Sequence, residues 1–130
     1  MQKHIKKSLH NIKLNYKLIL YILALLVLYG TMAPVSDLGI QLDIPFKEYI
    51  DKIVHVLMFM ALGVFIYPSY PKINPWMLTG ILVLYGISIE IMQNYLPTGR
   101  SFELADWVAD IFGIILGYLI YNTLKSRFLK

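Results

Sequence analysis

Four apolar runs separated by polar connections dominate the chain: Leu18 to Met32, Ile53 to Tyr67, Trp76 to Ile89 and Ile111 to Thr123. With their flanks, each approaches the roughly 20 residues that a helix rising about 1.5 Å per residue needs to cross a bilayer. None alternates with a period of two, as the strands of a membrane barrel would. We therefore predict an all-α polytopic membrane protein with four transmembrane helices in a compact bundle, over about residues 16–33, 49–68, 75–95 and 103–124.

Composition supports a membrane location and narrows the chemistry. Of the 130 residues, 58% are hydrophobic and only 15% are charged, which is more apolar than a soluble domain of this size. The absence of cysteine excludes disulfides, thiol nucleophiles and thiolate metal sites. The first apolar run is expected to be retained, because "TMAPVSD" is a poor cleavage site for a signal peptide. No repeat or linker divides the chain, so we expect a single domain over residues 1–130.

The basic residues predict the orientation. With four spans, the two termini and the connection between the second and third helices share one side of the membrane. Nine of the 12 Lys and Arg residues lie on that side, and only Lys47, Lys52 and Arg100 lie on the other. By the positive-inside rule both termini are cytoplasmic. The net charge of +4 is thus a topology signal, so we expect membrane lipid and no nucleic acid as partner.

Three ionisable side chains are expected at one depth inside the membrane. Counting along each helix from its cytoplasmic end places His55, Glu90 and Asp110 about 20–22 Å above the inner boundary, below the outer surface. Asp51 and Asp106 each lie one turn nearer the outside, where Arg100 in the last loop can reach them. A charge at such depth costs at least about 2.5 kcal/mol and is rare without a partner or a role.

Helical periodicity places these polar residues on faces that meet other helices. Asp106, Asp110, Gly113 and Gly117 share one stripe of the fourth helix, and a Gly-x-x-x-Gly surface lets two backbones approach closely. Similar stripes join Glu90 to Gly86 and Gln93 on the third helix, and Asp51 to His55 on the second. We therefore predict a polar pocket buried within the bundle and opening outward.

Such a pocket permits acid–base chemistry. Two carboxyl groups in different environments can act as acid and base, His55 can shuttle a proton, and Arg100 can bind an anionic phosphate or carboxylate. His55, Glu90, Asp106 and Asp110 also offer donors for a divalent metal. Since no signature such as His-Glu-x-x-His is present, we predict no metal site and no cofactor, with a divalent metal as the alternative. The structural alternative is an ion-pair network with Arg100 that only holds the helices together.

The polar residues resemble a known family. The segments "DKIVHVLMFMALGVF", "EIMQNYLPTGRSFELAD" and "DWVADIFGIILG" are similar to the VanZ-like family of small bacterial membrane proteins, over about residues 51–118. The shared pattern is Asp-Lys-x-x-His, Glu-x-x-Gln, Gly-Arg-x-x-acid-x-x-Asp and a Gly-x-x-x-Gly close. Asp110 departs from it, since the family typically has Asn there, and this favours other residues for ionisable chemistry. The candidate catalytic residues are His55, Glu90 and Asp106, and the candidate substrate-binding residues are Asp51, Lys52, Gln93, Arg100 and Asp110.

The resemblance implies resistance to lipoglycopeptide antibiotics such as teicoplanin, exerted at the outer face of the bacterial cytoplasmic membrane. Two hypotheses fit an outward-opening pocket. In the first, the protein acts on or binds a lipid-linked or peptidoglycan-derived substrate. In the second, it is a non-catalytic membrane module that binds drug, lipid or a partner, and the polar residues form a structural network.

Overall fold

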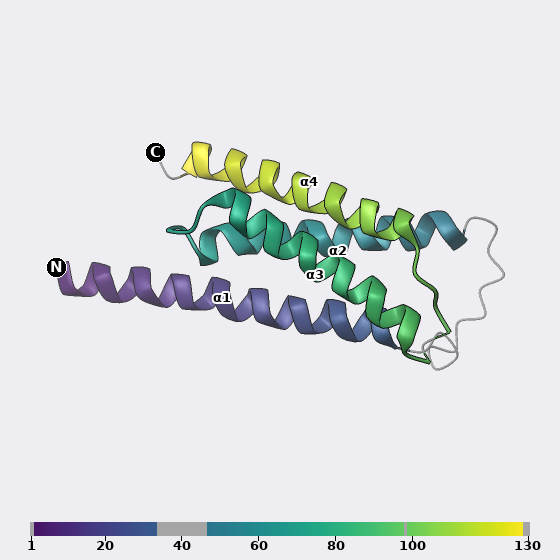
Figure 1. Ribbon diagram of the computed structural model, residues 1–130. Helices are drawn as coiled ribbons and strands as arrows, with labels where there is room; N and C mark the ends of the chain where they lie inside the picture. Colours follow the sequence, from purple (N-terminus) through teal and green to yellow (C-terminus); the bar gives the residue numbers. More distant parts are fainter. Residues whose placement is uncertain (1, 34–46, 98, 129–130) are drawn as a thin grey trace.

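Four helices account for nearly all of the computed structural model, which describes residues 2–33, 47–97 and 99–128 (Figure 1). They are α1 (Gln2–Met32), α2 (Lys47–Ser69), α3 (Pro75–Tyr95) and α4 (Leu104–Phe128), and the described residues contain no strand. Each helix contains a segment long and apolar enough to cross a membrane. The chain is therefore an all-helical, multi-pass membrane protein. Asp37 and Asp43, in the predicted first outer loop, lie outside the described residues.

The helix ends follow local sequence signals. Asn74 caps α3, because its side-chain oxygen accepts a hydrogen bond from the backbone N–H of Trp76 at 2.9 Å, and Pro75 occupies the first turn. α1 begins at Gln2, well before residue 16. Its basic first half carries no membrane-span signal, so hydropathy alone does not detect it. α4 continues to Phe128, one turn beyond the expected end.

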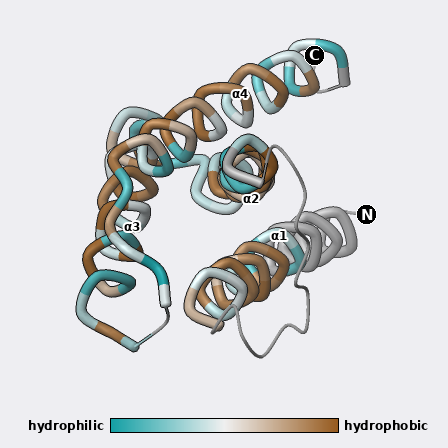
Figure 2. Tube along the Cα trace, turned by 90° about the vertical axis from the view of Figure 1, so that its right-hand side faces the viewer, coloured by the Kyte–Doolittle hydropathy of each residue, from teal (hydrophilic) through white to brown (hydrophobic). Residues whose placement is uncertain are grey.

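α2 is the central helix and contacts the other three (Figure 2). Its most extensive interface is with α4, where glycines replace side chains between the two backbones. A methyl group added at Gly117 would lie 2.5 Å from the Met60 carbonyl oxygen and 2.8 Å from the Gly63 Cα. The Gly-x-x-x-Gly stripe predicted from sequence is thus the contact surface of α4 on α2.

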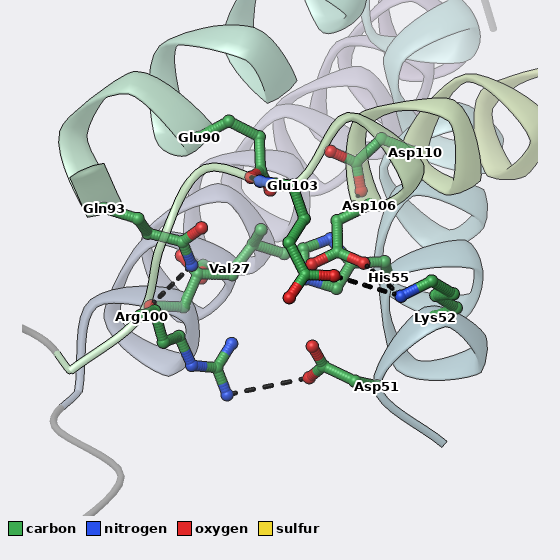
Figure 3. Close-up of polar contacts among 11 residues, drawn as sticks. Val27, Asp51, Lys52, His55, Glu90, Gln93, Arg100, Glu103, Asp106 and Asp110 are labelled. Atoms are coloured by element: carbon green, nitrogen blue, oxygen red, sulfur yellow. Dashed lines mark hydrogen bonds and ion pairs between the residues drawn. The ribbon is translucent and has the colours of Figure 1, made fainter. Parts of the chain in front are cut away.

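α1 packs on α2 and is also tied to α3 by two hydrogen bonds to backbone carbonyls. The Tyr85 hydroxyl donates to Ala24 O at 2.6 Å, and Gln93 Nε2 donates to Thr31 O at 2.9 Å. The first and last described residues lie at the same end of the molecule as the α2–α3 connection (Figure 1). The connection from α3 to α4 lies at the opposite end, where the polar residues of the predicted pocket gather (Figure 3).

Candidate functional site

His55 and Asp110 form the buried centre of the site. His55, on α2, is 1% exposed, and its Nδ1 lies 2.8 Å from Oδ1 of the fully buried Asp110 on α4. When Asp110 is ionised, its carboxylate can only accept a hydrogen bond, so the His55 tautomer that fits this contact carries its hydrogen on Nδ1. The other ring nitrogen, Nε2, has no hydrogen-bond partner. Asp110 thus orients an imidazole whose second nitrogen is available.

Glu90 completes a buried group that we call the deep tier: His55, Glu90 and Asp110. One ligand atom from each of the three lies within 4.8 Å of the others. The Glu90 carboxylate accepts a hydrogen bond from the backbone N–H of Glu103 through Oε2, at 3.2 Å, whereas its Oε1 and Oδ2 of Asp110 have no partner. Gly86 permits this approach, because a Cβ there would lie 2.9 Å from Asp110 Oδ2. The three residues predicted to share one depth are brought together.

A second group lies nearer the end of the helices, below Glu90 and Asp110 in the view of Figure 3. We call it the shallow tier: Asp51, Lys52, Arg100, Glu103 and Asp106. Lys52 Nζ lies 3.2 Å from Glu103 Oε2 and 3.2 Å from Asp106 Oδ1, which joins α2 to the start of α4. Arg100 Nη2 lies 3.7 Å from Oδ1 of Asp51, one of the two acids that the sequence placed within its reach. Both cationic side chains thus neutralise carboxylates of the shallow tier.

Asp106 connects the two tiers. Its side chain is 7% exposed, and while Oδ1 faces Lys52, Oδ2 lies 3.9 Å from Nε2 of His55. That separation is too long for a hydrogen bond. The unpartnered nitrogen of His55 therefore faces a carboxylate oxygen without being bonded to it.

A cavity of about 430 Å³ lies against the shallow tier. Its polar lining includes five of the predicted site residues together with Glu103: Asp51, Lys52, Gln93, Arg100, Glu103 and Asp106. The loop beside it turns at Gly99, whose positive φ of 72° favours glycine. His55, Glu90 and Asp110 lie behind this lining and are at most 1% exposed. A molecule in the cavity would meet the shallow tier first.

The structure gathers all eight predicted site residues at one end of the molecule, and it adds Glu103. Glu103 binds Lys52 through its side chain and Glu90 through its backbone N–H. Its place in the segment Gly-Arg-x-x-acid was the available sequence signal. Lys52 follows Asp51 in the sequence, but its ion-pair partners in the structure are Asp106 of α4 and Glu103 of the preceding loop.

Four helices of membrane-spanning length that bring polar and charged side chains together at one end define a small polytopic membrane protein with a buried polar cluster. The family model VanZ/LLP1 matches residues 7–125 of the chain. The protein therefore belongs to the VanZ/LLP1 family, and the match includes α1, which the sequence motifs alone did not cover. Comparison with curated proteins and with solved structures gave no match.

Proposed function

We propose that the protein binds an anionic, lipid-linked or peptidoglycan-derived molecule of the bacterial envelope in the cavity of the shallow tier. One observation carries the proposal: Lys52 and Arg100 line a polar cavity set between helices of membrane-spanning length. Phosphate and carboxylate groups are the ligands that such a pair of cations favours. A bound anion would compete with the carboxylates that face Lys52 and Arg100 in the structure: Glu103, Asp106 and Asp51. Apolar chains of the same ligand would remain in the bilayer beside the helices.

The cavity faces the extracytoplasmic side in this proposal, with both termini in the cytoplasm. Support comes from the distribution of Lys and Arg along the sequence, because nine of 12 fall in the two terminal segments and the α2–α3 connection. Envelope precursors are exposed on that side of the cytoplasmic membrane. Membership of the VanZ/LLP1 family makes teicoplanin resistance the phenotype to test.

His55, Glu90 and Asp106 are the candidate acid–base groups if the bound molecule is also transformed. Asp106 lines the cavity, and His55 lies directly behind it with a free ring nitrogen. A non-catalytic binding module is the second candidate, and the cross-links of Lys52 and Gln93 between helices favour it. The two candidates differ in whether a titratable group is needed.

Teicoplanin inhibitory concentrations in a susceptible Gram-positive host test the proposal. The host would express wild type, Lys52→Gln or Arg100→Gln at matched membrane levels. Lys72→Gln is the charge-matched control, because Lys72 is exposed in the α2–α3 connection away from the cavity. We expect wild type and the control to raise the inhibitory concentration and the two cavity variants to lose most of the effect. Equal protection by all four proteins would overturn the binding site.

Glu90→Gln separates the catalytic from the non-catalytic candidate. Glutamine keeps the size of the side chain and can accept the Glu103 hydrogen bond through its amide oxygen, but it cannot transfer a proton. Loss of protection at normal membrane level supports acid–base chemistry. Full protection by this variant leaves a binding module as the function.

A further inference from the structure

We infer that His55, Asp51 and Asp106 form a binding site for a divalent transition-metal ion at the floor of the cavity. One ligand atom from each of these residues lies within 4.8 Å of the other two. The sequence predicted no metal, because no contiguous metal motif is present; the site is instead assembled from α2 and α4. The inference concerns binding alone and does not depend on the proposed substrate.

The unpartnered nitrogen of His55 is the first argument. A metal-binding histidine usually donates its second ring N–H to a carboxylate, which fixes the ring and leaves the other nitrogen for the metal. His55 has this arrangement, with Nδ1 held by Asp110 at 2.8 Å and Nε2 buried without a hydrogen-bond partner. An unsatisfied buried nitrogen of this kind is costly unless something binds it.

The position of the carboxylates is the second argument. Two ligands of one ion at about 2.0–2.2 Å each are at most about 4.4 Å apart, and Asp106 Oδ2 lies 3.9 Å from His55 Nε2. Asp51 is one helical turn before His55, so both side chains project from the same face of α2. Asp51 is partly exposed, and one of its carboxylate oxygens lies within 4.8 Å of the ligand atoms of His55 and Asp106.

The deep tier is a second group of three residues whose ligand atoms lie within 4.8 Å of one another. It differs from the group of His55, Asp51 and Asp106 in how easily an ion could reach it from the cavity. The deep tier lies behind the cavity lining, and the nitrogen of His55 that faces Asp110 is already hydrogen-bonded. Asp51 and Asp106 line the cavity, so an ion bound there would have a path of entry and open positions for a ligand. Lys52 leaves Oδ2 of Asp106 free, because it contacts Oδ1.

One imidazole nitrogen and two carboxylate oxygens suit zinc or manganese better than magnesium or calcium, which favour oxygen ligands alone. Three protein ligands with an open position are also typical of catalytic zinc sites. An ion at this place would lie beside Lys52 and Arg100 and would add a further positive charge for phosphate oxygens of a bound molecule. With the ion bound, the site could therefore bind a phosphate group through the metal as well as through Lys52 and Arg100.

Metal binding to the full-length protein in lipid nanodiscs tests the inference. The chain has three histidines and no cysteine, so a His4→Gln/His10→Gln background with a non-histidine affinity tag leaves His55 as the sole imidazole. After chelator treatment, Zn²⁺ and Mn²⁺ are each titrated alone by calorimetry, with Mg²⁺ for comparison, and bound metal is counted by mass spectrometry. We expect one Zn²⁺ or Mn²⁺ per chain and markedly weaker binding of Mg²⁺.

Variants identify the ligands. His55→Gln and Asp106→Asn are each expected to weaken binding at least about tenfold. Lys72→Gln is the control, since Lys72 is exposed in the α2–α3 connection away from the cavity, and it should bind like the background protein. Helix content and a single elution peak establish that each variant is folded. If His55→Gln does not fold, Asp106→Asn alone tests the inference.

No bound ion in the background protein, or binding unchanged in Asp106→Asn, would overturn the inference. Loss of binding in Glu90→Gln but not in Asp106→Asn would also overturn it and move the ion to the deep tier.

Discussion

Nδ1 of His55 is hydrogen-bonded to Oδ1 of Asp110 at 2.8 Å, and both side chains are at most 1% exposed. This contact joins α2 to α4 in the interior of the protein and directs the free nitrogen of His55 toward Asp106, 3.9 Å away. In this contact Oδ1 of Asp110 serves as a hydrogen-bond acceptor, and the side-chain amide oxygen of an Asn could serve in the same way.

Asp110→Asn should therefore preserve the orientation of His55, whereas Asp110→Leu should not. The Asn side-chain oxygen can accept from Nδ1–H, but Leu leaves this buried donor unsatisfied at a cost of about 1–3 kcal/mol. Nitrogen-15 spectra of the His4→Gln/His10→Gln protein report which nitrogen of His55 carries the hydrogen. The Nδ1–H form should persist in Asp110→Asn and be lost in Asp110→Leu. The same tautomer population in both variants would contradict the orienting role.

Lys52 should contribute more to stability than its partner Glu103. Lys52 is the cation that faces Asp106, whose side chain is only 7% exposed, whereas the Glu103 side chain is 50% exposed. We expect Lys52→Met to lower the free energy of unfolding by about 1–2 kcal/mol, since it leaves Asp106 without its ammonium partner. Glu103→Gln should cost less than about 1 kcal/mol. Reversible unfolding in mixed micelles, with a chelator present, measures the free energy of unfolding of both variants. Equal losses in Lys52→Met and Glu103→Gln would contradict the greater contribution of Lys52.

The polar stripes were predictable because they depend on periodicity alone. His55 follows Asp51 by four residues, and Asp110 follows Asp106 by four, so each pair shares a helix face whatever the neighbouring helix does. The same argument placed Gly113 and Gly117 on that face of α4, and the structure shows both in contact with α2. The four helices were predictable for a similar reason, since length and hydropathy are properties of each segment.

The partners between helices were not predictable in this way. Which carboxylate Lys52 binds depends on the rotation of α2 against α4 to within part of a turn, and the sequence does not encode that rotation in any single motif. The same rotation also decides that one carboxylate oxygen of Asp106 faces Lys52 and the other faces His55. The link from Gln93 to α1 was also missed, because its acceptor is the backbone carbonyl of Thr31, a group that every residue possesses.

Cysteine labelling can test the proposed orientation without background, because the natural chain has no cysteine. Ser101, next to the cavity, and Lys72, in the α2–α3 connection, are both exposed. If the termini are cytoplasmic, Ser101→Cys should react with a membrane-impermeant maleimide in intact cells. Lys72→Cys should react only after the membrane is permeabilised. The reverse pattern would place the cavity on the cytoplasmic side and remove the support for an extracytoplasmic ligand.

The α2–α4 contact should be intolerant of a single methyl group at Gly117. An added Cβ would lie 2.5 Å from Met60 O and 2.8 Å from Gly63 Cα, and both neighbours are backbone atoms that cannot rotate away. We expect Gly117→Ala to force the helices apart and destabilise the protein by about 1–3 kcal/mol. Gly80→Ala is the matched control, because nothing lies within 4 Å of its added methyl, and alanine favours a helix by up to about 1 kcal/mol. Thermal unfolding in micelles should therefore show a lower midpoint for Gly117→Ala and an unchanged or higher one for Gly80→Ala. His55 and Asp110 face each other across the same α2–α4 interface, so Gly117→Ala should also weaken the hydrogen bond between them. If Gly117→Ala is destabilised while this hydrogen bond stays intact, the two ends of the interface act independently.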